Sequence, residues 1–208
     1  MVIKSLKLKN FRNYDFLSIE FDHATNIFYG DNAQGKTNIL EAVYLTGTTK
    51  SHRGTKDRDL IQFGNEESHI ETVIEKDGIE FQVDMHLKKN SPKGIAINKI
   101  PIRKASELFG LVHLVFFSPE DLNIIKNGPA ERRRFMDLEL SQLDKVYLSD
   151  LANYNRIINQ RNRLLKDCQN RAELNEMLDL WDMQLIQYGS RIMERREKFL
   201  EEVNEIIS

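Results

Sequence analysis

The segment from Gly30 to Thr37 has the residue types and spacing of a phosphate-binding loop. Its glycines let the main chain curl until successive N–H groups point at one anion, and a following helix directs its positive end at the same anion. Lys36 can then reach the β- and γ-phosphates of a nucleotide, and the Thr37 hydroxyl can coordinate Mg²⁺. The spacing G-x-x-x-x-G-K-[ST] is filled by Gly30, Asp31, Asn32, Ala33, Gln34, Gly35, Lys36 and Thr37.

The segments on either side of the loop are those that such a loop requires. Apolar Ile27–Tyr29 runs directly into Gly30 and is predicted to be a short strand. Apolar residues then recur at helical spacing from Lys36 to about Leu45. An incidental glycine-rich turn is therefore disfavoured, and we expect nucleotide binding. The loop alone does not choose among kinases, GTPases, helicases and ABC-type ATPases, which share it.

A working ATPase of this kind also needs an acid at the tip of a neighbouring strand, where it holds Mg²⁺ and polarises water. The candidates are Glu120 and Asp121, which follow apolar Leu111–Phe117, a predicted buried strand. Ser118-Pro119 intervenes, however, and Ser-Pro followed by acids is a typical helix start. A helix cap is favoured, while a magnesium ligand and another contact near the nucleotide remain alternatives. We expect no catalytic acid in these residues.

Strand-like patterns dominate the first 125 residues, and helical patterns dominate residues 126–208. We therefore expect two lobes, 1–125 and 126–208, the second with two long antiparallel helices. The predicted connector between them, Lys166–Arg171, contains Cys168, for which no nucleophilic role is indicated. The last helical pattern reaches Ser208 without a stop signal, so the chain is expected to be truncated. The predicted strands lie at Leu6–Leu8, Leu17–Phe21, Ser68–Glu75, Ile79–Leu87 and Ile95–Ile102, the last of them bent near Pro101, with a hairpin turn at Lys76-Asp77-Gly78.

Composition limits the class of protein. With 30 basic and 32 acidic residues among 208, the formal charge is −2, which excludes a histone-like polycation. A hydrophobic fraction of 40% supports a packed core. One cysteine cannot form an internal disulfide, so the chain is expected in the reducing cytoplasm. No apolar run approaches a membrane span, and no membrane association is expected.

Several further motifs accompany the loop. Lys9–Tyr14 reads KNFRNY, Asn32–Asn38 reads NAQGKTN, Phe117–Leu122 reads FSPEDL, and Arg132–Asp137 reads RRRFMD. Together these motifs resemble the RecF family of bacterial DNA replication and repair proteins, relatives of the SMC and Rad50 ATPases. The resemblance starts at Met1 and covers the whole chain. It is far more specific than the phosphate loop alone.

The resemblance implies an α/β fold: a P-loop ABC-type ATPase head lobe with an antiparallel β part, followed by a helical lobe. It implies ATP and Mg²⁺ as ligands, with Asn38 and Arg12 also near the nucleotide. It further implies an ATP-dependent dimer that binds single-strand/double-strand DNA junctions and works with RecO and RecR in gap repair and replication restart, within the response to DNA damage. The family's signature and Walker B motifs are missing from these residues. We therefore expect weak ATP binding without hydrolysis here, although the intact family is a weak DNA-dependent ATPase.

Basic residues in two places are candidates for DNA backbone contacts. Arg53 and Lys56 follow the loop's helix, where nearby acids also allow a merely solvated loop. Arg132 and Arg133 open the helical part; with Arg134 they point in three directions, so at least one is expected to pair internally. Two other functions remain open: a P-loop kinase or GTPase, which would need a complete catalytic site, and a helical protein-interaction module.

Overall fold

The computed structural model describes the backbone of residues 1–167 and 171–208, and their side chains apart from those of residues 120, 123, 167 and 171–177. The chain divides into two compact units, Met1–Phe116 and Phe117–Ser208. A division of functional lobes at residue 125 stays a prediction. Cys168 and the middle of the predicted connector lie outside the described residues.

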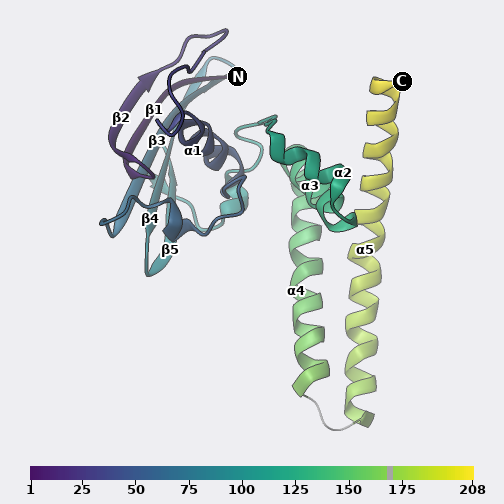
Figure 1. The fold of residues 1–208 in the computed structure, drawn as a ribbon. Coiled ribbons are helices and arrows are strands. Elements are labelled where there is room, and N and C mark those ends of the chain that lie inside the picture. The colour runs from purple at the N-terminus through teal and green to yellow at the C-terminus, as the bar shows by residue number, and fades with distance from the viewer. Residues whose placement is uncertain (168–170) are drawn as a thin grey trace. The chain divides into compact units, whose positions relative to one another are not determined.

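The first unit is a six-stranded antiparallel sheet with helix α1 on one face (Figure 1). Alternation builds this sheet, because Leu6 and Leu8 of β1 face the core while Lys7 and Lys9 face away. In β4, Val83, Met85 and Leu87 are buried in the same way. The strand order is β2-β1-β3-β4-β5-β6. The strands are β1 (Val2–Phe11), β2 (Tyr14–Glu20), β3 (Glu67–Lys76), β4 (Ile79–Lys88), β5 (Ser91–Ile97) and β6 (Ile100–Pro101).

Helix α1 (Lys36–Thr48) packs its buried residues Ile39, Ala42 and Leu45 into the same core as the sheet. The buried Thr46 hydroxyl lies 2.9 Å from the hydroxyl of Thr72 on β3, which satisfies both groups inside the apolar layer. A short 3₁₀ helix, η1 (Asp57–Leu60), follows. The helix thus holds the phosphate loop at a fixed place on the sheet.

Two segments that the sequence predicts to be strands are irregular, and these predictions were wrong. Neither Ile27–Tyr29 nor Leu111–Phe117 belongs to the sheet of the described residues. Buried and exposed side chains still alternate in part: Tyr29 and Val115 are 91% and 96% exposed, whereas Phe28 packs on the core. An apolar run favours a strand, but a strand also needs a neighbour to accept its backbone hydrogen bonds.

The segment Ile95–Ile102 also differs from the prediction of one bent strand. It forms β5 and β6, which pair antiparallel across Asn98 and Lys99. Both turn residues have positive φ angles, 51° and 66°. The hairpin at Lys76–Ile79 has the same left-handed geometry at Asp77 and Gly78 and confirms the prediction there.

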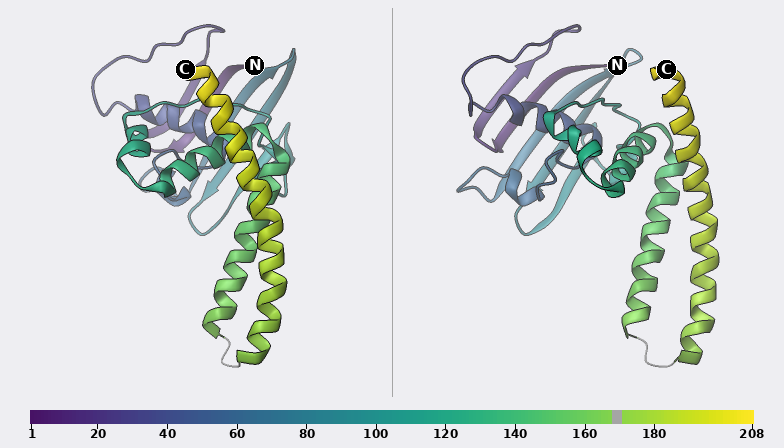
Figure 2. Two further views of the ribbon diagram at one scale, coloured as in Figure 1. Left: turned by 90° about the vertical axis from the view of Figure 1, so that its right-hand side faces the viewer. Right: turned by 45° about the vertical axis from the view of Figure 1, so that its right-hand side comes forward.

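The second unit is helical, and the antiparallel pair of long helices is confirmed. Helices α4 and α5 lie side by side in Figures 1 and 2. The Arg161 guanidinium on α4 donates to Asp182 on α5 at 2.8 Å. No helix among residues 1–167 and 171–208 has both the length and the hydrophobicity of a membrane span. The helices are η3 (Pro119–Leu122), α2 (Asn123–Lys126), α3 (Pro129–Leu143), α4 (Lys145–Asp167) and α5 (Arg171–Ile207); the first unit adds η2 (Ala105–Glu107).

Candidate nucleotide-binding site

The predicted phosphate loop curls back on itself at the N-terminus of α1. Gly30, Ala33 and Gly35 all have positive φ angles, 136°, 65° and 98°. The Lys36 ammonium donates to the carbonyl of Gly30 at 2.8 Å and to that of Asp31 at 2.6 Å. The lysine therefore lies inside the curl, at the place where it could exchange these carbonyls for phosphate oxygens.

The start of α1 is open to an anion. Gly35 caps the helix without any side-chain hydrogen bond. The first N–H groups of a helix have no acceptor within it, and the helix dipole adds positive potential there. Thr37, in the first turn, is exposed and offers its hydroxyl. The loop thus presents the donors that a phosphate chain requires.

The β1–β2 turn supports the loop from behind. Asn13 Nδ2 and the Tyr14 hydroxyl both donate to the carbonyl of Gln34, at 3.2 and 3.3 Å. A Cβ atom at Gly35 would lie 2.6 Å from Asn13 Nδ2 and from the Tyr14 hydroxyl oxygen. Glycine is therefore required at position 35 both by its φ angle and by the closeness of this turn.

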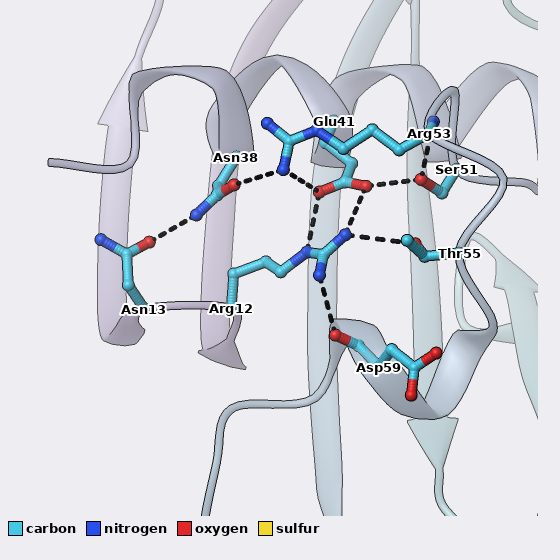
Figure 3. Close-up of polar contacts among 8 residues, drawn as sticks. All are labelled: Arg12, Asn13, Asn38, Glu41, Ser51, Arg53, Thr55 and Asp59. Carbon is cyan, nitrogen blue, oxygen red and sulfur yellow. Dashed lines mark hydrogen bonds and ion pairs between the residues drawn. The ribbon is translucent and has the colours of Figure 1, made fainter. Parts of the chain in front are cut away.

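A buried acid, Glu41 on α1, lies at the centre of a polar network beside the loop (Figure 3). Arg12 binds its carboxylate through two nitrogens, Nε and Nη2, each at 2.8 Å. The Ser51 hydroxyl donates to the same carboxylate, and Arg53 Nη1 lies 3.9 Å from it. Arg12 also donates to Thr55 Oγ1 at 3.1 Å. The network fixes the segment after α1 against the β1–β2 turn.

The charge of Glu41 is maintained by these partners. Burial by itself raises the pKa of a carboxyl, but the hydrogen bonds from Arg12 and Ser51, with the charges of Arg12 and Arg53, outweigh it. The net effect is a pKa below the ordinary value of 4.5. Glu41 is therefore ionised at neutral pH.

The network reaches the loop itself through Asn38. Arg53 Nη1 donates to Asn38 Oδ1 at 3.5 Å, and Asn38 Nδ2 donates to Asn13 Oδ1 at 2.7 Å. Asn13 in turn holds the carbonyl of Gln34. A continuous set of polar contacts thus joins Arg12 to the phosphate loop, with the Arg53 guanidinium between Asn38 and Glu41 of α1 (Figure 3).

The structure places the remaining predicted site residues as follows. Asp31, Asn32, Ala33 and Gln34 are exposed on the loop. Lys56 is exposed just before η1. Arg132 and Arg133 are exposed on α3 in the second unit, and the expected internal pairing is made by Arg134, 3.8 Å from Glu131.

The segment after Leu111–Phe117 confirms the predicted helix start. The 3₁₀ helix η3 begins at Pro119, and the Asp121 carboxylate accepts from the Ser118 N–H at 2.6 Å and from its hydroxyl at 3.2 Å. Asp121 therefore has a capping role. The side chain of Glu120, the other candidate magnesium ligand, lies outside the described residues.

Sequence reasoning missed Glu41 and Lys93. Glu41 stands between Ile39 and Leu45 on the buried side of α1, and an acid within an apolar stripe is the signal that could have revealed it. Lys93, on β5, binds the carbonyl of Thr49 and lies 3.0 Å from Asp57. Both residues attach the segment after α1 to the sheet.

Comparison with known proteins agrees with this geometry. Bacterial proteins called DNA replication and repair protein RecF are 64% identical over 207 residues in Agathobacter rectalis, 61% over 210 residues in Lachnospira eligens, and 46% over 204 residues in Clostridium botulinum. They match 98–100% of this chain, whereas the chain spans only 56–58% of their length.

Solved structures give the same result. A RecF–ATP structure from the RecFOR pathway superposes with a TM-score of 0.92 at 36% identity, over 96% of this chain and 54% of that chain. An SMC ATPase, 20% identical, shares the fold with a TM-score of 0.53 over 66% of this chain. The fold is thus that of a P-loop ABC-type ATPase head. The AAA ATPase domain family matches residues 1–202, so the chain belongs to this family, and its whole length is similar to the proteins called DNA replication and repair protein RecF.

Proposed function

We propose that this chain is the ATP-binding part of a cytoplasmic DNA-binding ATPase that acts in recombinational gap repair and replication restart. The observation that carries the proposal is the curled loop with the Lys36 ammonium on the carbonyls of Gly30 and Asp31. Support comes from the relatives, which are called DNA replication and repair proteins, and from the similar structure that is described as RecF–ATP.

The residues fit magnesium–ATP. The uncapped start of α1 and the loop N–H groups bind phosphate oxygens, and Lys36 turns from the loop carbonyls to the β- and γ-phosphates. The exposed Thr37 hydroxyl would hold Mg²⁺. A bound Mg²⁺ neutralises charge on the phosphates. The side chains of Asn38 and Arg12 belong to the network behind the loop, so their role is to position it.

This network supplies a route by which nucleotide could alter a surface. Movement of the loop on ATP binding would displace Asn13, which contacts the loop, and Asn38, which contacts Asn13. Arg53 and Glu41 would pass this displacement to the segment after α1. We propose that this change completes an ATP-dependent dimer that binds single-strand/double-strand DNA junctions, and that RecO and RecR act with it. The free energy of ATP binding drives such a switch, and no chemical reaction on the DNA is needed.

The experiment compares Lys36→Ala with Lys50→Ala, an exposed lysine beyond the C-terminus of α1. The protein is extended to the length of its curated relatives, and sedimentation is measured with and without ATP and Mg²⁺, together with binding to gapped and fully duplex DNA. Loss of the ATP-dependent dimer and of gapped-DNA preference in Lys36→Ala alone is expected. Undiminished ATP-stimulated assembly in Lys36→Ala would refute the proposal, and an equal response to GTP would favour a different nucleotide-binding class.

A further inference from the structure

Two histidines and two carboxylates meet on the face of the sheet opposite α1. In β3 the buried residues Ser68, Ile70 and Thr72 alternate with His69 and Glu71. In β4 the buried residues alternate in the same way with Asp84 and His86. Successive side chains of a strand point to opposite faces, so these four residues share the face turned away from the core.

We propose that His69, Glu71, Asp84 and His86 form a binding site for a transition-metal ion of the Zn²⁺ class. The pairing of β3 with β4 places His69 directly opposite His86 and Glu71 directly opposite Asp84. The four side chains thus occupy the corners of one small area of sheet, with the histidines at one end and the carboxylates at the other.

The distances suit a single ion. One potential ligand atom from each of His69, Glu71 and Asp84 lies within 4.8 Å of the others. His69 Nε2 is 3.2 Å from Asp84 Oδ1, and the two imidazole centroids are 5.9 Å apart. Ligands in a tetrahedral zinc site, with bonds of about 2.0–2.1 Å, are separated by about 3.3 Å. His69, Glu71 and Asp84 already lie near that spacing, and His86 would join them by turning from Glu67.

The arrangement of charges also favours a cation. Two carboxylates directly opposite each other across a strand pair repel, whereas a sheet stabilised by ion pairs would place unlike groups opposite. The present partners of the two carboxylates reduce this repulsion only in part. Lys7 binds Glu71 at 2.8 Å, and Gln82 Nε2 donates to both Asp84 oxygens at 3.1 and 3.0 Å. His86 lies 3.2 Å from Glu67. The side chains of His69 and His86 are each 41% exposed, so an ion in solution can reach both imidazoles.

The neighbouring strands leave room on one side. The residues of β5 opposite His86 and Asp84 are the small Gly94 and Ala96. On the other side, β1 places Lys9 opposite His69 and Lys7 opposite Glu71. An ion can therefore approach over β5, while Lys7 competes with it for Glu71.

The donor types select the metal. Imidazole with carboxylate suits Zn²⁺, Co²⁺ and Ni²⁺, whereas Mg²⁺ prefers oxygen ligands alone. The site is therefore chemically distinct from the proposed magnesium position at Thr37, and the inference does not depend on the proposed function.

The test is titration of the metal-free chain with Zn²⁺ alone, without nucleotide, in a Cys168→Ser background so that the thiol cannot bind the ion. Zn²⁺ affinity is measured by competition with a chromophoric chelator, and Co²⁺ gives visible absorption bands that report tetrahedral coordination. His69→Ala and His86→Ala should each weaken binding at least about tenfold, since even residues outside the ligand shell cost 10–100-fold. His23→Ala, an exposed histidine on a loop, is the matched control.

One further variant distinguishes a metal site from a set of polar contacts that only stabilises the sheet. Lys7→Ala frees Glu71 from its present partner and should strengthen Zn²⁺ binding, whereas loss of an ion pair would only destabilise the sheet. Circular dichroism verifies that each variant is folded. Zn²⁺ affinity that is absent, or that is unchanged in His69→Ala and His86→Ala, would overturn the proposal, as would an equal loss in His23→Ala.

Discussion

Glu41 shows how a single buried charge can hold a functional segment. Its side chain is fully buried, and its partners come from the β1–β2 turn and from the segment after α1. Arg12, its main partner, is 29 residues away in sequence. No local spacing connects the two residues, which is why the phosphate loop could be predicted from sequence and this network could not.

Replacement of Glu41 by Gln should destabilise the chain by about 3 kcal/mol, because the Arg12 guanidinium loses its buried counter-charge. The pKa of Glu41 is depressed, so its stabilising effect is fully present above the ordinary value of 4.5 and is lost as pH falls through the lower folded-state value. The gap in stability between the parent chain and Glu41→Gln should therefore be widest above about pH 5 and narrow below pH 4. Urea unfolding from pH 7 to pH 3.5 measures it.

The control for this measurement is Glu20→Gln on β2, an exposed carboxylate, which should change stability by less than about 0.5 kcal/mol. If the stability gap stayed constant down to pH 3.5, the ionised form of Glu41 would not be the source of its effect.

At the scale of elements, local sequence patterns predicted the helices and turns that are formed by contacts between residues close in sequence. Helix α1, the hairpin at Asp77-Gly78 and the helix start at Ser118-Pro119 all follow from short-range spacing and turn chemistry. The predictions for Ile27–Tyr29 and Leu111–Phe117 failed, because a strand is defined by pairing with a distant segment. Their apolar composition favours a strand, but neither segment pairs with the sheet of the described residues.

Helices α3, α4 and α5 are joined by a polar cluster of Asp137, Tyr147 and Arg196. Arg196 Nη2 donates to Asp137 at 2.6 Å, its Nε lies 3.1 Å from the Tyr147 hydroxyl, and that hydroxyl donates to Asp137. Burial, with the contact to Asp137, raises the pKa of Tyr147. The hydroxyl therefore stays protonated at neutral pH, where it remains a hydrogen-bond donor to Asp137.

Arg196→Met should destabilise the helical unit by about 3 kcal/mol, because it leaves the Asp137 charge without its ion-pair partner in a largely buried setting. The adjacent Arg195 provides a matched control. It lies 3.4 Å from Asp144 but is 51% exposed, so Arg195→Met should cost less than about 1 kcal/mol. Thermal unfolding followed by circular dichroism compares the two variants, and equal losses would contradict the assignment of Arg196 to the helix junction.

At the scale of the whole molecule, charge limits how DNA could be bound. The chain has a net charge of −2, so attraction to a polyanion has to come from local basic surfaces and not from the overall field. Arg53 is already engaged with Asn38 and Glu41, which leaves exposed Lys56 as the stronger candidate after α1. In the second unit, Arg132 and Arg133 are exposed on α3.

Contacts with backbone phosphates predict a specific salt dependence. Each phosphate neutralised adds about 0.9 to the slope of log affinity against log salt on duplex DNA, so replacing both Arg132 and Arg133 by Ala should lower the slope by up to about 1.8. Arg134→Ala, at the neighbouring position that pairs with Glu131, should lower it less. The measurement is fluorescence anisotropy on a gapped duplex over a series of salt concentrations, with the protein at the length of its curated relatives and ATP present. An affinity loss with an unchanged slope would mean that these arginines act on folding or assembly, because only ion release at phosphates changes the slope.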